Sequence, residues 1–410
     1  MGETNTMSAR AHAVALFSGG LDSILAARLL MEQGLTVRCL HFVTPFFGKP
    51  ELIPHWEAIY GLSIEAVDVG ADFVRLLRRF PEHGYGKVMN PCVDCKILMM
   101  RKAREIMTAL GARLIASGEV LGQRPMSQRR DTLNIISREA GVSGLLLRPL
   151  CARHLPPTDA ERSGLVDRLR LGAISGRGRQ EQLELAARMN LAEIPTPAGG
   201  CRLAEKENAR RYWPVLTRLT DPAPADFALA NVGRQFWRED AWLSMGRNEA
   251  DNAALAGLLG LEGVDGDELD GQAAPPASCA TSFRASDVPF GSDAAVLRLA
   301  RLPGPLAVVR FVGEKARAAW RDSVARSRGP NCSDTPSLPA LCDAAALLAS
   351  YAPRAGNNEA DVECRPVNGG PAWNIRIRPS RETGYTAGGP SFEDVKAALR
   401  GERCSEGVSE

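Results

Sequence analysis

The sequence predicts an α/β protein, with a doubly wound parallel sheet followed by a second, smaller α+β domain. Short apolar runs alternate with helical stretches through the first half of the chain, which is typical of βαβ units. The length of 410 residues suits two or three domains. The composition, 45% hydrophobic and 24% charged, is that of an ordinary globular chain.

The first expected element is a buried strand over residues 12–17. It leads into the loop Ser18–Ser23 (SGGLDS), and residues 24–33 then have helical composition up to Gly34. A second strand is expected over residues 37–42. Since strand, helix and strand follow within one short unit, the two strands are predicted to run parallel.

The same alternation continues to the end of the first domain. We expect strands at 63–69, 113–117 and 145–150, and helices at 96–110 and 127–140. A flexible N-terminus (1–11) precedes a nucleotide-binding domain over 12–220, and the Pro-rich run 221–226 is expected to be a linker. The second domain is expected over 225–400, with flexible insertions at 260–277 and 326–338 and a disordered tail at 401–410.

Composition excludes several classes of protein. No apolar run approaches the roughly 20 residues that a membrane-spanning helix needs, so no membrane partner is expected. Ten cysteines are too sparse for a disulfide scaffold, and no secretory signal precedes them, so we expect a reducing cytoplasm. The net charge of +2 hides a basic middle, because residues 75–215 carry 25 Lys+Arg against 14 Asp+Glu. A polyanion could bind this middle.

The loop Ser18–Ser23 has the features of a phosphate-binding loop. Its two glycines let the backbone approach a ligand closely, and the following helix presents unpaired N–H groups at its N-terminus. The loop lacks the lysine of a Walker A motif and the spacing of GxGxxG. The alternative is a glycine turn in which Asp22 caps the helix.

This loop resembles the SGGxDS loop of the ATP pyrophosphatases, the PP-loop family. The resemblance implies that the β and γ phosphates of ATP, with Mg²⁺, are held by Ser18, Gly19, Gly20, Asp22 and Ser23. In that family ATP is split into AMP and pyrophosphate while a substrate oxygen is adenylated. Asp22 is accordingly predicted to be catalytic.

The pair Cys92 and Cys95 forms a Cys-x-x-Cys motif, and Cys201 follows two glycines that would let the backbone approach a cluster. From spacing alone, a persulfide or redox pair, a structural zinc site and an iron–sulfur site all stay open. Three thiolates leave one iron of a four-iron cluster without a protein ligand, where a sulfide could bind. The other seven cysteines are expected to pack as apolar side chains.

The segment Ala116–Gln128 resembles a stretch of the ThiI-type 4-thiouridine synthetases, and Leu147–Leu150 resembles their LRPL element. PP-loop enzymes that thiolate tRNA with a three-cysteine cluster share the cysteine arrangement, which implies a 4Fe–4S cluster on Cys92, Cys95 and Cys201. The resemblance further implies nucleotide-binding roles for Phe42, Gly118, Glu119 and Gln123, and RNA-binding roles for Arg124, Ser127, Gln128, Arg129 and Arg130.

The chain also departs from that family. We expect neither the RNA-binding THUMP module before the loop nor a rhodanese module after the domain. In the second domain, Val232–Arg238 and Trp242–Asn252 instead resemble the RNA-binding module of NFACT-type ribosome-associated proteins. Residues 225–410 are acidic, with 20 Lys+Arg against 25 Asp+Glu, and the aromatic residues Phe236, Trp237 and Trp242 are expected in the core.

Together these features predict an ATP-dependent tRNA sulfurtransferase that adenylates a uridine carbonyl oxygen and replaces it with sulfur. Its predicted partners are tRNA and a sulfur donor, either a cysteine desulfurase or free sulfide. One alternative is a PP-loop enzyme that adenylates another acceptor, for amide formation or small-molecule thiolation. Another is an RNA-binding or ribosome-associated factor with an inactive PP-loop.

Overall fold

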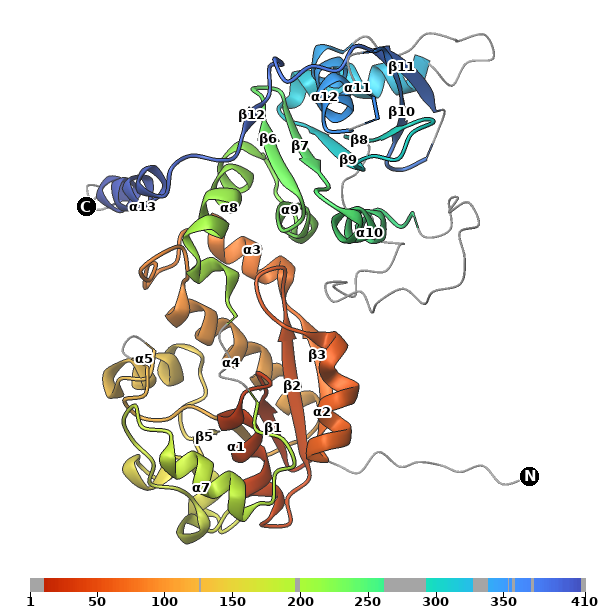
Figure 1. Cartoon of the computed structure of the whole chain (residues 1–410). Coiled ribbons are helices and arrows are strands. Elements are labelled where there is room, and N and C mark those ends of the chain that lie inside the picture. The colour runs from red at the N-terminus through yellow and green to blue at the C-terminus, as the bar shows by residue number, and fades with distance from the viewer. Residues whose placement is uncertain are drawn as a thin grey trace. The chain divides into compact units, whose positions relative to one another are not determined.

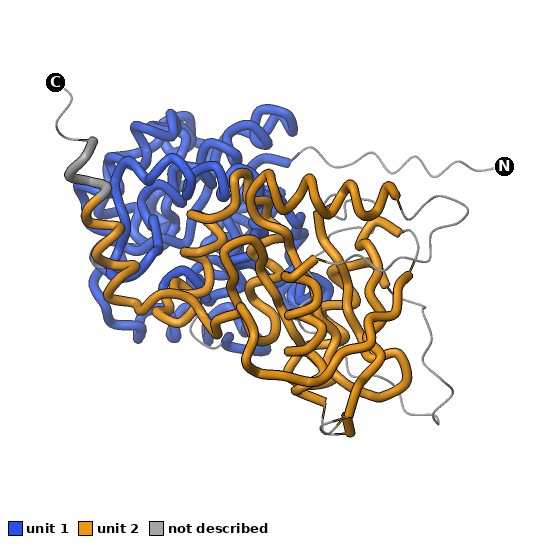
Figure 2. The backbone as a smooth tube through the Cα atoms, turned by 90° about the horizontal axis from the view of Figure 1, so that it is seen from above, with its two compact units in different colours: residues 1–204 blue, residues 205–410 orange. Residues whose placement is uncertain are grey.

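The computed structural model describes residues 11–124, 127–195, 200–261, 293–326, 338–352, 354–355, 358–369 and 372–406. The chain divides into two compact units, Met1–Ala204 (unit 1) and Glu205–Glu410 (unit 2), which Figure 2 shows in two colours. The division comes earlier than the expected linker at 221–226. The predicted insertions at 260–277 and 326–338 lie almost entirely outside the described residues.

Unit 1 contains a five-stranded sheet of order β3-β2-β1-β4-β5 in its described residues, and every neighbouring pair is parallel. Its strands are β1 Ala13–Leu16, β2 Val37–Val43, β3 Ser63–Asp68, β4 Leu114–Ser117 and β5 Leu146–Leu147. The predicted doubly wound parallel sheet is confirmed.

Helices cover both faces of this sheet (Figure 1). They are α1 Leu21–Met31, α2 Ile53–Tyr60, α3 Gly70–Arg78, α4 Cys92–Ala109, α5 Arg130–Glu139, α6 Asp159–Arg162 and α7 Gln180–Arg188. Alternate residues of β1 enter different cores: Ala13 and Ala15 pack with side chains of α1 and α2, whereas Val14 and Leu16 pack with those of α4 and α5. This is why the strands are apolar throughout rather than alternating.

The chain order of the strands places a topological switch point beside β1. β1 lies between β2 and β4, so the chain winds to one edge through β3 and then crosses back to β4. Leu16 and Ser117 are register partners at the carboxyl ends of β1 and β4. The loops that leave these two strands therefore emerge side by side, where ligands bind in doubly wound sheets.

Several local details differ from the sequence predictions. Helix α4 begins at Cys92, so the Cys-x-x-Cys pair lies in its first turn rather than before the helix. The helices α2, α3, α6 and α7 were not predicted. Short 3₁₀ turns connect elements at η1 Pro50–Leu52, η2 Ala152–His154, η3 Arg168–Arg170 and η4 Arg202–Ala204.

Unit 2 is built on an antiparallel sheet of order β11-β10-β8-β9-β7-β6-β12. Its strands are β6 Arg234–Trp237, β7 Ala241–Met245, β8 Ala294–Leu299, β9 Ala307–Phe311, β10 Ala360–Pro366, β11 Trp373–Ile377 and β12 Thr386–Ala387. The described helices are α8 Lys206–Arg218, α9 Pro224–Ala230, α10 Glu249–Leu258, α11 Glu314–Arg326, α12 Pro339–Ser350 and α13 Phe392–Glu406.

The aromatic residues of β6 and β7 are in the core, as predicted. Phe236, Trp237 and Trp242 are all buried, and the two tryptophan rings stack 5.1 Å apart. The Trp242 indole donates a hydrogen bond of 2.8 Å to Gln235. These rings therefore stabilise the sheet and are not available to stack on RNA bases.

The expected linker at 221–226 is packed within unit 2. Pro224 begins α9, and Asp226 is fully buried, where it accepts a hydrogen bond from the Ala223 N–H and pairs with Arg310 at 2.9 Å. Proline at the first turn of a helix is common, which explains how a Pro-rich run becomes α9. Helix α13 continues past Gly401 to Glu406. In the described part of the chain, no helix has the length and apolarity to cross a membrane.

Candidate functional site

The loop after β1 turns sharply into α1 at Gly19, whose φ is +75°. A Cβ at this glycine would lie 2.5 Å from the Trp56 ring. Trp56 itself packs against Phe17 and His41, with ring centroids 5.3 Å and 5.0 Å away. Only glycine satisfies both the backbone angle and the close approach.

Hydroxyl groups inside the loop hold its shape. The Ser23 hydroxyl donates to the Gly20 carbonyl at 2.7 Å, and the Ser18 hydroxyl lies 3.4 Å from the Ser23 oxygen. Leu21 then begins α1, so the positive end of the helix dipole lies at the loop. A loop with this form suits a phosphate group.

The carboxyl end of β4 packs directly against this loop. A Cβ at Gly118 would lie 2.5 Å from the carbonyl carbon and oxygen of Asp22 and 2.7 Å from the nitrogen of Ser23. From the same connection, the Gln123 amide donates a 3.1 Å hydrogen bond to the Asp22 carboxylate. The structure thus brings together two motifs that lie about a hundred residues apart in the chain.

Glu119 is a buried carboxylate at this switch point, 2% exposed. It accepts hydrogen bonds from Ser117 at 3.1 Å and Arg148 at 3.0 Å, and Lys96 of α4 lies 3.6 Å away. Burial acts to raise the pKa of Glu119, but Lys96 and Arg148 outweigh it, so this pKa lies below its usual value. Glu119 is therefore held as an ion.

Two carboxylate oxygens at the site could accept a further ligand, and one of them, Glu119 Oε1, also lies 3.6 Å from the Lys96 ammonium. Asp22 Oδ1 and Glu119 Oε1 are both buried, and neither has a hydrogen-bond partner among the described residues. Buried polar atoms without partners are costly unless a ligand satisfies them. Oxygen ligands of this kind suit Mg²⁺ that is also bound to phosphate oxygens.

The three predicted cysteines come from two segments of unit 1. Cys92 and Cys95 occupy the first turn of α4, and the Asn90 amide donates to the Cys92 sulfur at 3.0 Å. The segment after Cys201 is held by a backbone hydrogen bond of 3.1 Å from Met89 to the Leu203 carbonyl. This bond places Cys201 beside the start of α4.

Electrostatic coupling shows that the three thiols are neighbours. Burial raises the pKa of Cys95 far above its usual value, and the thiols of Cys201 and Cys92 raise it further, while Lys96 acts in the opposite direction. All three cysteines are free of disulfides. No group of three His, Cys, Asp or Glu side chains within the described residues converges on a point that could hold one metal ion.

Lys96 connects the cysteines to the predicted nucleotide site. It follows Cys95 directly in α4, and its ammonium group pairs with Glu119 beyond the end of β4. Glu119 in turn follows Gly118, which contacts Asp22 and Ser23 of the loop. A continuous set of contacts thus links the phosphate loop to the thiols.

The remaining predicted residues fall into two groups. Phe42 lies in the core on the α4 face, and Ser127 and Gln128 are also buried, so any ligand contact they make lies inside the fold. Exposed guanidinium groups are presented by Arg124, Arg129 and Arg130. A basic exposed group of this kind is compatible with phosphate contacts.

Sequence reasoning missed three residues of the site. Lys96, Arg148 and Asn90 received no role, although Lys96 adjoins the Cys-x-x-Cys motif and Arg148 lies inside the quoted LRPL element. Their positions within or beside recognised motifs could have identified them as candidate site residues. Of the remaining cysteines, Cys39, Cys151 and Cys364 are buried, Cys342 is partly buried, and Cys279, Cys332 and the Cys404 side chain lie outside the described set.

Residues 8–154 match the family model described as "Thiamine biosynthesis protein (ThiI)". A "Probable tRNA sulfurtransferase" of Thermococcus kodakarensis is 32% identical over 142 residues, 33% of this chain and 36% of that protein. A "tRNA-specific 2-thiouridylase MnmA" of Nitratidesulfovibrio vulgaris is 35% identical over 127 residues, 27% of this chain and 35% of that protein. These matches confirm the predicted ThiI-like PP-loop character of this segment.

The chain spans about a third of the length of the curated relatives it matches. Among solved structures, a "U34-tRNA thiolase NcsA from Methanococcus maripaludis with its [4Fe-4S] cluster" has 16% sequence identity and a TM-score of 0.26, covering 46% of this chain and 61% of that one. The resemblance of unit 2 to an NFACT-type module stays a prediction.

Proposed function

We propose that this protein is an ATP-dependent tRNA sulfurtransferase. A uridine carbonyl oxygen attacks the α-phosphorus of ATP, and pyrophosphate leaves. Sulfur then attacks the carbon that bears this oxygen, and AMP leaves with the original oxygen. The observation that carries the proposal is the continuous set of contacts from Asp22 through Gly118, Glu119 and Lys96 to Cys95. This set couples a nucleotide site to a sulfur site.

The loop Ser18–Ser23 would bind the β and γ phosphates at the N-terminus of α1. Asp22 and Glu119 each offer a buried oxygen for Mg²⁺. Bound Mg²⁺ supplies neutralisation of the charge that develops on the leaving pyrophosphate. The Gln123 amide donates a hydrogen bond to Asp22 Oδ2, and this bond fixes the direction of Asp22 Oδ1.

Lys96 would have two roles at the junction of the sites. Its charge helps to hold Glu119 ionised, and the same charge opposes the rise that burial causes in the pKa of the neighbouring Cys95 thiol. Because Lys96 is 28% exposed, solvent screens part of this effect. Deprotonated sulfur is the form needed both for metal binding and for nucleophilic attack.

The cysteines support a three-thiolate iron–sulfur cluster. Cys92 and Cys95 lie in one helical turn, and Cys201 acts electrostatically on Cys95, so the three thiols are candidates for the ligands of one cluster. A cluster held by three thiolates supplies one iron that is open to sulfide. The Asn90 amide, which donates to the Cys92 sulfur, would tune the thiolate.

The substrate class rests on the named relatives and on charge. The relatives are named tRNA sulfurtransferases and a 2-thiouridylase, and unit 1 carries exposed arginines at 124, 129 and 130. We therefore propose tRNA as the substrate, with a cysteine desulfurase or free sulfide as the sulfur donor. Because the two kinds of relative differ, experiment must decide whether the oxygen at position 2 or at position 4 of uracil is replaced by sulfur.

The test is nucleoside mass spectrometry of tRNA incubated with anaerobically reconstituted protein, ATP and sulfide. Formation of 4-thiouridine or 2-thiouridine that depends on ATP supports the proposal and identifies the exchanged atom. Cys95→Ala should abolish thiolation and lower the bound iron. Cys364→Ala removes a buried thiol of unit 2 and should change neither quantity. Unchanged nucleosides with wild-type protein, in the presence of bound ATP, would contradict the proposal.

A further inference from the structure

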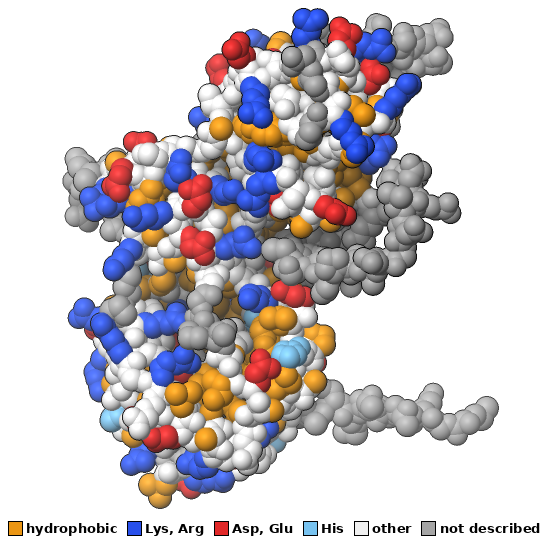
Figure 3. All heavy atoms as spheres, in the orientation of Figure 1, with side chains coloured by type: hydrophobic (Ala, Val, Ile, Leu, Met, Phe, Trp, Pro, Cys, Tyr) orange, Lys and Arg blue, Asp and Glu red, His pale blue; other side chains and the backbone are white. Residues whose placement is uncertain are grey.

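A second polar pocket lies in unit 2, outside the site described above. It has a volume of about 230 Å³ and is formed by α8, β6, the residue after α12, and the turn at the end of β12. Its polar lining includes Arg210, Arg211 and Arg234, against the single carboxylate of Glu207. Figure 3 shows Lys and Arg side chains gathered on this face of unit 2.

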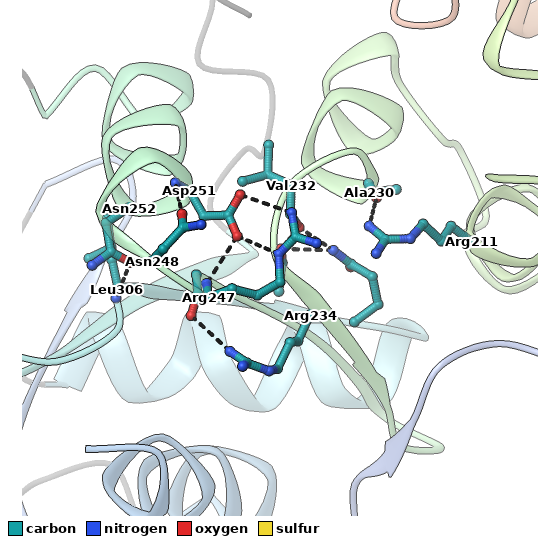
Figure 4. A network of polar contacts seen from close by, with 12 residues as sticks. Arg211, Ala230, Val232, Arg234, Arg247, Asn248, Asp251, Asn252 and Leu306 are labelled. Carbon is teal, nitrogen blue, oxygen red and sulfur yellow. Dashed lines mark hydrogen bonds and ion pairs between the residues drawn. The ribbon is translucent and has the colours of Figure 1, made fainter. Parts of the chain in front are cut away.

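The charges around this pocket are unevenly balanced. Arg210 pairs with Glu207 at 3.0 Å, and the nearby Arg247 pairs with Asp251 at 2.6 Å. Arg211 instead donates to the Ala230 carbonyl at 3.1 Å and Arg234 to the Gly246 carbonyl at 3.5 Å (Figure 4). No carboxylate of the described residues forms an ion pair with either of these two guanidinium groups.

The pocket therefore has two guanidinium groups without a direct ion pair among the described residues, and the Glu207 and Asp251 carboxylates offset only part of the effects that disfavour the charge of Arg211. Burial lowers the pKa of Arg211, and the like charge of Arg247 lowers it further. A partly buried cation next to another cation is unfavourable unless an anion approaches. The charge distribution thus favours an anionic ligand over a neutral one.

Aromatic contacts hold Arg234 in place. The guanidinium of Arg234 lies 4.7 Å from the centroid of the Tyr351 ring, and that of Arg381 lies 4.8 Å from the same centroid. Stacking of this kind holds a guanidinium against the face of the ring, while its N–H groups stay free to donate at its edge. Arg234 is therefore ordered before any ligand binds, which lowers the entropy cost of binding.

The opposite wall is made of glycines, which keep the pocket open. Gly388 has a φ of +76° and donates its N–H to the Gln235 carbonyl at 2.8 Å. A Cβ at Gly389 would lie 2.1 Å from the Arg210 carbonyl oxygen. Side chains at these two positions would strain the turn or fill the pocket.

We propose that this pocket binds a phosphate group between Arg211 and Arg234. Paired guanidinium groups match the several oxygens of a phosphate, and a pocket of this volume admits a phosphate with part of a sugar but not a whole nucleotide. The phosphate can belong to an RNA strand or to a free mononucleotide. The proposal does not depend on the thiolation chemistry, since binding is measured without ATP or sulfide.

The test compares the charge-removing variant Arg211→Gln/Arg234→Gln with the full-length wild type. Three ligands are titrated: a fluorescent tRNA, AMP and inorganic phosphate. The matched control is Arg376→Gln/Arg378→Gln, which removes the same charge at β11, the opposite edge of the sheet from β12. Circular dichroism and thermal melting check that each variant folds. If the first variant does not fold, Arg211→Lys/Arg234→Lys replaces it, which keeps the charge but removes the guanidinium groups.

If the phosphate belongs to RNA, the first variant should bind tRNA at least about tenfold more weakly than the control. The magnitude of its slope of log affinity against log salt should fall by about 1, for the one lost phosphate contact. If the ligand is a free mononucleotide, the variant should bind one equivalent less of AMP and of phosphate than the control, because the loop of unit 1 stays intact, while tRNA affinity stays at the control value. Equal affinities of variant and control for all three ligands would overturn the proposal.

Discussion

Glu119 of unit 1 and Asp226 of unit 2 are both buried carboxylates beside an arginine, yet their surroundings shift their pKa values in opposite directions. In unit 1, Lys96 and Arg148 outweigh burial and lower the pKa of Glu119. In unit 2, burial outweighs the single cation Arg310 and raises the pKa of Asp226. The ionised form is therefore stabilised by the fold in unit 1 and disfavoured by it in unit 2.

The contrast distinguishes a site from a structural contact. Glu119 has two cations and lies at the switch point of a parallel sheet, beside the loop Ser18–Ser23. Asp226 uses its oxygens to receive the Ala223 N–H and to pair with Arg310, within α9 and its surroundings. A carboxylate that the fold keeps ionised at the ligand-binding edge of a sheet is a candidate functional group, whereas ionisation disfavoured by packing indicates a structural role.

The largest expected effect is on activity. Glu119→Gln keeps the size of the side chain but removes the charge that would bind Mg²⁺, so ATP-dependent thiolation should fall about a hundredfold or more. Initial rates at saturating ATP and tRNA measure the loss. Asp226→Asn should leave the rate within about twofold of wild type.

A control is needed because Glu119→Gln also leaves two cations near a neutral group. Glu161→Gln removes another buried carboxylate of unit 1, one that pairs with Arg168 outside the site. It should lower stability without a comparable loss of rate. Equal activity losses in both variants would assign Glu119 a structural role.

The close approach of β4 to the phosphate loop predicts a steric effect. Gly118→Ala places a methyl group against the Asp22 backbone, so we expect a loss of about 2 kcal/mol in the free energy of unfolding and weaker ATP binding. Gly178→Ala has no atom within 4 Å of its new Cβ and should be neutral or slightly stabilising. Denaturant unfolding and ATP titration measure both. Equal stability and equal ATP affinity of the two variants would contradict a close contact between Gly118 and the Asp22 backbone.

The two carboxylates should also make stability depend on pH in opposite directions. The lowered pKa of Glu119 gives stability that is present above about pH 4.3, the unfolded value, and is lost as pH falls through the folded pKa. The raised pKa of Asp226 gives stability that is present below about pH 3.9 and is lost as pH rises through the folded pKa.

The measurement is the free energy of unfolding from about pH 3 to pH 7, with each group contributing at most about 1.4 kcal/mol per pH unit. The difference between wild type and Glu119→Gln should grow in favour of wild type as pH rises. The difference between wild type and Asp226→Asn should move the other way. Parallel curves for both variants would show that the two sites do not differ in ionisation.

The smallest predicted effect concerns a helix cap in unit 2. The Asn248 side chain accepts a 2.9 Å hydrogen bond from the Asp251 N–H at the start of α10. Asn248→Ala should cost about 1 kcal/mol of stability and leave thiolation unchanged. Urea unfolding checks the first and the tRNA assay the second. A lost activity would contradict the assignment of the chemistry to unit 1.

Much of unit 1 could be predicted because its signals are local. Apolar runs located all five strands, and the predicted glycine loop lies between the first strand and the first helix. The start of α4 at Cys92 was missed, since proline and asparagine before it read as a loop. Helix α9 was missed for a similar reason, because its composition was that of a linker and its burial depends on Arg310.

By itself the sequence determined the fold class and supplied the prediction of a phosphate loop and of three cysteine ligands, because periodicity and motif spacing are properties of neighbouring residues. Tertiary structure alone decided that Gly118 contacts Asp22, that Lys96 and Arg148 converge on Glu119, and that Arg211 and Arg234 share a pocket. The physical reason is that these contacts join segments far apart in the chain. Their energies depend on burial and on which charges meet, and neither is encoded in a local pattern.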